Sequence, residues 1–180
     1  MLVNCAGITQ SALFLKTVDE DINEIVATNL TAMMIGTRFL LRQGYLRGKR
    51  GGGKKRAEGG KQQEQEQEGG SPVIINVASL LGLSGGYGAV AYAASKAGVL
   101  GFTRALAAEY ASHGVRVNAL VPGYVASAMT ASLDAETLER RIPLGRFGMV
   151  EEIADAALFL ARNEYAHNCV LNLDGGLSAV

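Results

Sequence analysis

Tyr92 and Lys96 stand four residues apart at the start of a predicted helix, so their side chains share one face of it. A phenol has an ordinary pKa of about 10 and is a poor acid or base at neutral pH. A lysine ammonium about 4 Å away would lower that pKa by about three units, from roughly 4 kcal/mol of attraction at an effective dielectric constant of about 20. The pair predicts a general acid or base, although tyrosine and lysine at this spacing also occur on ordinary solvated helix faces.

Ser79 is a third candidate for the same site. It follows a β-branched run at 73–77 and precedes Tyr92 across a loop rich in glycine. Its hydroxyl could donate to the substrate oxygen that Tyr92 protonates, or it could cap the end of the strand. No histidine is placed to activate it, so a serine nucleophile is not expected.

The segments around these residues alternate between apolar strands and amphipathic helices. Strands are predicted at 2–3, 73–77, 115–121 and 169–173. Helices are predicted at 17–43, 92–111 and 150–162. A capping box, Thr17-Val-Asp-Glu20, is expected to open the first helix, and Gly114 to stop the second. This alternation predicts an α/β fold with a parallel sheet and crossover helices.

The residues that end the predicted strands are polar or rich in glycine. Because ligands bind beyond the carboxyl ends of the strands in an open α/β sheet, these residues are expected to converge on one functional edge. They are Asn4, Ser79, Pro122, Gly123 and Asp174.

Composition excludes several classes of protein. The 17 basic and 17 acidic side chains sum to zero, which argues against a nucleic-acid partner along the whole chain. Two cysteines and two histidines cannot build a disulfide framework or a histidine-rich metal site. No run approaches 18 uninterrupted apolar residues, so no membrane span is expected. We expect an intracellular protein.

Residues 44–70 differ in composition from the rest of the 180-residue chain. These 27 residues contain nine glycines, seven basic residues and four glutamates, and no valine, isoleucine or phenylalanine. Such a segment buries too little apolar surface to offset its ordering entropy, so we predict a disordered insertion within one domain that spans 1–180. Its basic first half could be a nucleic-acid or nuclear-localisation patch, but a solvated loop is the favoured interpretation.

Several motifs occur in a fixed order along the chain. They are Asn4-Cys-Ala-Gly7, Thr28-Asn29-Leu30, Asn76-Val-Ala-Ser79, Tyr92-Ala-Ala-Ser-Lys96-Ala-Gly98, Arg116-Val-Asn118, Pro122-Gly123, Ile142-Pro-Leu-Gly-Arg-Phe-Gly148 and Asp174-Gly-Gly176. Together they resemble the short-chain dehydrogenase/reductase family, and within it the 3-oxoacyl-[acyl-carrier-protein] reductases and related carbonyl reductases. The resemblance covers everything outside 44–70.

The resemblance implies reduction of a ketone to a secondary alcohol, with NADP(H) favoured over NAD(H). Tyr92 would donate the proton, Lys96 would lower the pKa of the phenol and bind the nicotinamide ribose, Ser79 would orient the carbonyl, and Asn29 would hold a water linked to Lys96. The cofactor-binding residues that it implies are Asn4, Ala6, Gly7, Tyr92, Lys96, Pro122, Gly123, Val125 and Ser127.

By the same resemblance, the fold is a Rossmann-like doubly wound parallel sheet, of which the chain holds only the C-terminal part, strands four to seven. The glycine-rich turn that holds the cofactor pyrophosphate is not found in the sequence, so weak or no cofactor affinity is expected. The alternatives are a fragment of an ordinary reductase and a truncated protein stabilised by a partner. Asn168 stands where the family typically has glycine, but asparagine tolerates a left-handed backbone.

Two hypotheses about partners follow. The first is an enzyme that binds a small carbonyl substrate, such as a 3-oxoacyl thioester on acyl carrier protein, and that forms a homo-oligomer in its intact form. The second is a non-catalytic member that assembles with a full-length reductase and regulates it. Neither nucleic acid nor a membrane is an expected partner, and the sequence leaves cytoplasm and mitochondrion open as compartments.

Overall fold

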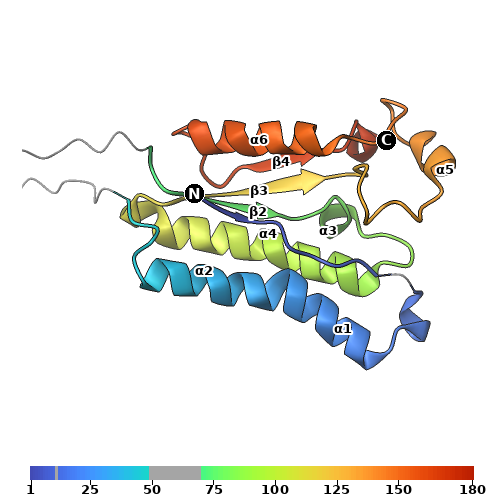
Figure 1. Ribbon diagram of the computed structural model, residues 1–180, viewed down its shortest axis with the longest axis horizontal. Coiled ribbons are helices and arrows are strands. Elements are labelled where there is room, and N and C mark those ends of the chain that lie inside the picture. Colours follow the sequence, from blue (N-terminus) through green and yellow to red (C-terminus); the bar gives the residue numbers. More distant parts are fainter. Residues whose placement is uncertain (11, 49–69) are drawn as a thin grey trace, which may run out of the picture.

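Four parallel strands form the centre of the computed structural model, which describes residues 1–10, 12–48 and 70–180 (Figure 1). They lie in the order β1-β2-β3-β4, and every neighbouring pair is parallel. Their bounds are Leu2–Asn4 for β1, Val73–Val77 for β2, Arg116–Pro122 for β3 and Val170–Leu173 for β4. The prediction of a parallel α/β sheet is therefore confirmed.

Helices cover both faces of this sheet (Figure 1). The long helix α4 packs on one face together with α1 and α2, and α6 packs on the other. The bounds are Asp19–Val26 for α1, Ala32–Arg42 for α2, Leu81–Ser84 for α3, Val90–Tyr110 for α4, Ala135–Glu139 for α5 and Val150–Arg162 for α6. None of the helices in the described ranges is long and apolar enough to cross a membrane.

The core follows from the alternation of side chains along the two central strands. Ile74 of β2 and Val117 of β3 pack toward α4, whereas Ile75 and Leu120 pack toward α6. All four are at most 1% exposed. Strands buried on both faces need apolar residues at consecutive positions, which explains the continuous runs in the sequence.

The start of the first helix differs from the prediction. The helix begins at Asp19 with Val18 as its N-cap, so the capping box at Thr17 is not formed. The Thr17 hydroxyl instead donates to the carbonyl oxygens of Ala12 and Leu13, because a short 3-10 turn at Phe14–Lys16 precedes it. Thr17 thus belongs to the loop that follows β1.

The first residues of the segment predicted to be disordered belong to the folded part. Leu46 is 7% exposed and packs in the cluster around Ile74, so the first residues of 44–70 belong to the folded part. The remainder of that prediction, over 49–69, lies outside the described residues.

Two asparagines shape the backbone as their positions suggested. Asn29 lies in a π-helical segment, Ala27–Thr31, that joins α1 to α2 and so interrupts the regular helix. Asn168 has a φ of 55°, which confirms that asparagine takes the left-handed conformation at this turn.

Candidate active site

Ser79 and Tyr92 line one cavity of about 590 Å³ at the carboxyl edge of the sheet. Ser79 lies just beyond the end of β2, and Tyr92 lies in the first turn of α4. Gly123, which follows β3, lines the same cavity. The cavity is otherwise mainly apolar, with leucines, a methionine and Tyr124 in its walls. The strand ends after β2 and β3 therefore meet at one edge as predicted.

The phenol of Tyr92 is buried, and its residue is 8% exposed. Burial raises the pKa of Tyr92 above its ordinary value, and a hydrogen bond with the Ser79 side chain lowers it by less. The expectation that Lys96 brings this pKa toward neutrality is wrong for the protein as it stands. The phenol is consequently protonated at neutral pH and able to donate a proton.

Lys96 lies beside the tyrosine ring rather than at its hydroxyl. Its Nζ atom is 5.8 Å from the ring centroid of Tyr92 and donates a hydrogen bond of 2.9 Å to the carbonyl oxygen of Val77. Burial lowers the pKa of Lys96, and the nearby Cys5 thiol partly offsets this effect. Its ammonium is thus held at the carboxyl end of β2, where desolvation makes the charge costly.

Asn29 ties the loop after β1 to helix α4. Its side-chain amide accepts a hydrogen bond from the Ile8 amide and donates to the Ile8 carbonyl, at 2.8 and 2.9 Å. It also donates to the Ser95 hydroxyl, which in turn donates to the Tyr92 carbonyl at 2.7 Å. Asn29 therefore supports α4 through Ser95. The predicted water on Asn29 stays a prediction.

Gly7 lies between Asn29 and Lys96. A Cβ atom at this position would lie 3.2 Å from Asn29 Oδ1 and 3.4 Å from Lys96 Nζ, closer than ordinary side-chain packing. The absence of a side chain on Gly7 leaves room above the lysine. This cradle fits the ribose side of a nicotinamide cofactor, because a backbone can approach a ligand closely only where no side chain intervenes.

The other predicted cofactor residues occupy different environments. Asn4 turns away from the cavity and donates to Thr37 Oγ1 and Asn76 Oδ1, at 3.0 and 2.8 Å. Ala6 is exposed after β1, and Pro122 ends β3. Val125 and Ser127 lie in the loop beyond β3, where Val125 forms a bridge with Gly148 and the Ser127 amide donates to Thr130 Oγ1. Their contacts with a cofactor stay predictions.

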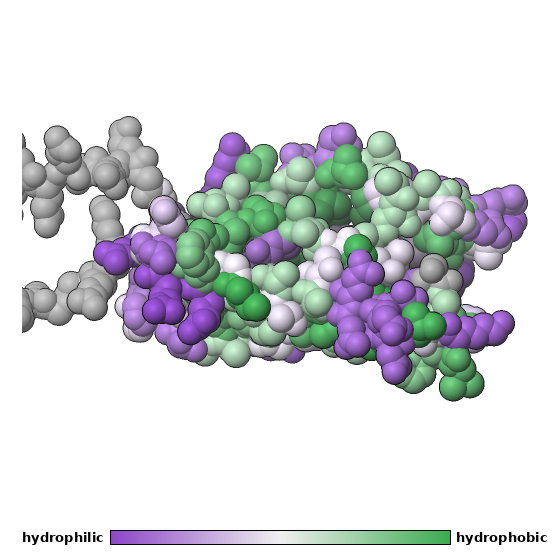
Figure 2. Space-filling view, turned by 60° about the horizontal axis from the view of Figure 1, so that its bottom comes forward, coloured by the Kyte–Doolittle hydropathy of each residue, from purple (hydrophilic) through white to green (hydrophobic). Residues whose placement is uncertain are grey.

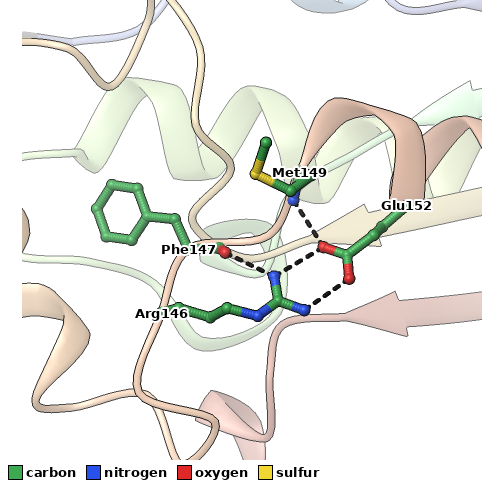
Figure 3. Close-up of polar contacts among 4 residues, drawn as sticks. All are labelled: Arg146, Phe147, Met149 and Glu152. Carbon is green, nitrogen blue, oxygen red and sulfur yellow. Dashed lines mark hydrogen bonds and ion pairs between the residues drawn. The ribbon is translucent and has the colours of Figure 1, made fainter.

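An ion pair braces the outer wall of the cavity (Figure 3). Arg146 donates to both carboxylate oxygens of Glu152, at 2.9 and 2.6 Å, and Glu152 also accepts from the Met149 amide at 2.7 Å. The segment held in this way contains Phe147, which stacks on Tyr124 with a centroid separation of 5.5 Å. The ion pair thus helps to fix Tyr124 in the cavity wall.

Several cavity residues were not singled out individually in the sequence. They are Thr9, Gln10 and Leu13 of the loop after β1, Tyr124, Met129, Leu133 and Leu138 of the segment after β3, and Leu177 after β4. These three segments are far apart in the chain, so no single spacing connects them. Leu177 had an indirect signal, since Asp174 accepts hydrogen bonds from the Gly176 and Ser178 amides and so folds the turn that presents Leu177.

Comparisons with known proteins agree on one family. A family model described as enoyl-(acyl carrier protein) reductase matches residues 61–178. The chain is 39% identical to carbonyl reductase family member 4 of Danio rerio over 176 residues, which covers 98% of this chain and 65% of that protein. It is also 39% identical to a human 3-oxoacyl-[acyl-carrier-protein] reductase over 179 residues, 99% of this chain and 66% of that protein.

A solved structure shows the same similarity. A candidate 2-deoxy-d-gluconate 3-dehydrogenase from Agrobacterium tumefaciens, crystallised with bound NADP, matches with a TM-score of 0.79 and 34% identity. The match covers 99% of this chain and 67% of that one. The chain thus spans about two thirds of the proteins that it resembles.

Proposed function

The chain belongs to the short-chain dehydrogenase/reductase family, and from this premise we propose that it carries the catalytic part of an NAD(P)H-dependent reductase that converts a ketone to a secondary alcohol. The observation that carries the proposal is the pair of hydroxyl groups, Ser79 and Tyr92, which face one apolar cavity. Two hydroxyls from different elements can donate to the two lone pairs of one carbonyl oxygen. That arrangement suits a carbonyl better than a carbon–carbon double bond, the substrate suggested by the enoyl reductase description of the family model.

The proton chemistry follows from the burial of the two titratable groups. When bound, a reduced nicotinamide would supply hydride to the carbonyl carbon. Tyr92 is protonated because burial raises its pKa, so its Oη–H can transfer a proton to the carbonyl oxygen as the negative charge develops there. Ser79 would hold that oxygen in place. Lys96, fixed by the Val77 carbonyl, would stabilise the phenolate that remains on Tyr92.

The cavity supports an acyl thioester as the substrate. Its wall is mainly apolar and fits an alkyl chain, although polar side chains such as Thr9, Gln10 and Thr130 also line it. Relatives at 39% identity include proteins named 3-oxoacyl-[acyl-carrier-protein] reductase, which points to a 3-oxoacyl group on acyl carrier protein. NADP(H) is the proposed cofactor, since a neighbour at 34% identity was crystallised with NADP.

A homo-oligomer is the proposed assembly. Figure 2 shows the face that carries the helix layer, where apolar groups gather along the middle and hydrophilic groups lie toward both ends. Ile35 and Phe39 of α2 are 62% and 55% exposed. Four residues separate them, so they share a face that a second copy of the chain could cover.

The test is reduction of a 3-oxoacyl thioester, followed by loss of NADPH absorbance, with the wild type and Tyr92→Phe side by side. Removing the acidic hydroxyl should lower turnover by about 10² to 10⁴-fold while cofactor fluorescence on binding stays unchanged. Tyr165→Phe is the matched control, because Tyr165 is 97% exposed. An enoyl thioester and NADH complete the comparison of substrates and cofactors.

Each outcome of this test is informative. Turnover by Tyr92→Phe at the wild-type rate would contradict the role of Tyr92. Preference for the enoyl thioester would favour reduction of a carbon–carbon double bond. A wild-type chain that neither binds NADPH nor turns over, but that associates with a full-length relative, would favour the non-catalytic assembly partner.

A further inference from the structure

Helix α4 begins without a capping side chain of its own. Its N-cap residue is Ala89, whose methyl group cannot accept a hydrogen bond. The first helical residue is Val90, so the amides of Ala91 and Tyr92 are the ones that an N-cap side chain would normally serve. Since Tyr92 is itself one of these residues, an uncapped start would let the proposed proton donor move with the fraying turn.

The missing acceptor comes from the loop that follows β1. Gln10 Oε1 accepts hydrogen bonds from the Ala91 amide at 2.8 Å and from the Tyr92 amide at 3.4 Å. These contacts join segments about eighty residues apart in the chain. A side chain from another segment thus provides the cap that the local sequence lacks.

The other end of the same amide is also held. Gln10 Nε2 donates to the Ala12 carbonyl at 2.7 Å and to Thr17 Oγ1 at 3.2 Å. These two acceptors orient the amide, so its oxygen points at the helix. Gln10 also lines the cavity that contains Ser79 and Tyr92. It therefore connects the loop bordering the cavity with the helix that carries the proton donor.

We propose that Gln10 is a positioning residue for carbonyl reduction: it caps α4 from outside the helix and so fixes the Tyr92 hydroxyl opposite Ser79. The proposal rests on the function proposed above. Misplacement of a reacting group by about 1 Å can lower a rate about a hundredfold, so a cap at this position acts on turnover through the position of Tyr92.

Three variants separate the cap from the loop contacts. Gln10→Met keeps the length of the side chain but loses its strong acceptor and its donor. Gln10→Glu keeps an acceptor for the two amides, which helix N-termini favour, and loses the donor to Ala12 and Thr17. Gln43→Met makes the same change at an exposed position beyond α2 and is the matched control.

Hydrogen exchange tests the cap without any activity. In Gln10→Met the Ala91 and Tyr92 amides should exchange about fivefold faster than in the wild type, and in Gln10→Glu and Gln43→Met at nearly the wild-type rate. If Gln10→Met fails to fold, Thr17→Val removes one of the acceptors that orient the amide and should give a smaller effect of the same kind. Unchanged exchange at both amides would overturn the proposal.

Turnover then tests positioning. Gln10→Met should lower kcat at least about tenfold with little change in the KM for NADPH, and Gln10→Glu should restore most of the loss. Faster exchange in Gln10→Met with an unchanged kcat would reduce Gln10 to a structural cap and overturn the proposal. So would a Gln10→Glu variant that is as slow as Gln10→Met.

If the wild-type chain shows no turnover, the position of Tyr92 is read from its phenol instead of from kcat. With carbon-13 in the tyrosine ring, NMR follows the titration of Tyr92 directly. Burial raises the pKa of Tyr92, so a tyrosine released by Gln10→Met should titrate at a lower pH than in the wild type. An unchanged titration would overturn the role of Gln10 independently of the reaction.

Discussion

The two ends of the central strand β3 both gather buried polar side chains, but they use them for opposite purposes. At its amino end, Arg116 donates to the carbonyl oxygens of Leu160, Ala161 and Ala166, at 2.7, 2.6 and 3.1 Å, and to the Ser71 hydroxyl at 2.7 Å. The guanidinium thereby closes the carboxyl end of α6 onto the sheet. Its donors are used entirely within the chain.

At the carboxyl edge the polar groups are held, but their reactive atoms remain available. Lys96 has a fixed position through Val77, and Tyr92 is fixed through the backbone of its helix and its contact with Ser79. Burial raises the pKa of Tyr92 and lowers that of Lys96, so the environment opposes the charged form of each. The buried charge of Lys96 therefore does not contribute to stability, whereas Tyr92 is buried as a neutral group.

The difference teaches how to distinguish a structural polar cluster from a functional one. At the amino end, the Leu160 and Ala161 carbonyl oxygens accept from Arg116, so removing the guanidinium has a cost. At the carboxyl edge, the charge of Lys96 is itself a cost, which only a function outside the fold explains. Substitution should therefore separate activity from stability at the two edges.

Lys96→Met gives the largest expected effect. Turnover of a carbonyl substrate should fall at least about a hundredfold, because the phenolate on Tyr92 loses its stabilising charge. The free energy of unfolding should change by no more than about 1 kcal/mol, since the lost hydrogen bond to Val77 is offset by relief of the buried charge. Steady-state kinetics and urea denaturation measure the two quantities.

Lys16→Met is the matched control, because Lys16 is exposed and lies outside the cavity. A Lys96→Met variant that loses several kcal/mol of stability would break the comparison, since Lys96 would then be a structural residue like Arg116.

Arg116→Met should give the next largest effect, and it should change the free energy of unfolding rather than turnover. The Leu160 and Ala161 carbonyl oxygens lose a charged donor, so the free energy of unfolding should fall by about 3 kcal/mol. The Ala166 carbonyl keeps its hydrogen bond from Asn118. Turnover per folded molecule should stay close to that of the wild type, because Arg116 lies at the far end of β3 from the cavity.

Arg104→Met, on the exposed side of α4, controls for the loss of an arginine. Equal stability of the two variants by urea denaturation would show that the carbonyl oxygens find other partners, and the amino end would lose its structural role.

The sequence predicted those features that depend on neighbouring residues. The helix at 150–162 has the bounds that its apolar spacing and its terminal residues indicated. Tyr92 and Lys96 lie four positions apart in α4 and therefore share one face of that helix. Ser79 was predicted from its place at the end of a strand and before the loop that leads to Tyr92. Local patterns therefore indicated both the elements and the reacting pair.

The features that the sequence did not reveal depend on contacts across the chain. Thr17 has the pattern of a capping residue, yet its hydroxyl donates to carbonyl oxygens of the preceding loop. Gln10 has no capping pattern, yet it caps α4. The pKa of Tyr92 was expected to fall, because the spacing gave a distance to Lys96 but not the burial that outweighs it. Desolvation is a property of the whole fold and has no local signal.

A second arginine, Arg146, can be compared with Arg116, because it also joins two segments but does so at the solvent-exposed surface. Arg146 pairs with the Glu152 carboxylate, and their side chains are 51% and 47% exposed (Figure 3). The hydrogen bond with Arg146, with help from the Met149 amide, lowers the pKa of Glu152 from 4.5 to about 2. Arg116, by contrast, bonds neutral groups, so only the Arg146 contact depends on the ionisation of its partner.

Glu152→Gln should give the smallest effect, and one that depends on pH. The folded pKa of Glu152 lies below its ordinary value, so its contribution is fully present above pH 4.5 and is lost as the pH falls toward 2. The difference in Tm between wild type and Glu152→Gln should therefore be largest near neutral pH and vanish near pH 2. Exposure and salt screening keep this difference small even at its largest.

Thermal denaturation of both proteins across this range, repeated at high salt, measures the effect. Glu136→Gln is the control, since Glu136 forms an exposed pair with Arg140 away from the Phe147 stack. Because the Arg146 contact holds the wall through Phe147 and Tyr124, its loss should raise the KM for the carbonyl substrate while kcat stays unchanged. A Tm difference that persists at pH 2, where the carboxyl group is protonated, would mean that Glu152 stabilises the wall by something other than its charge.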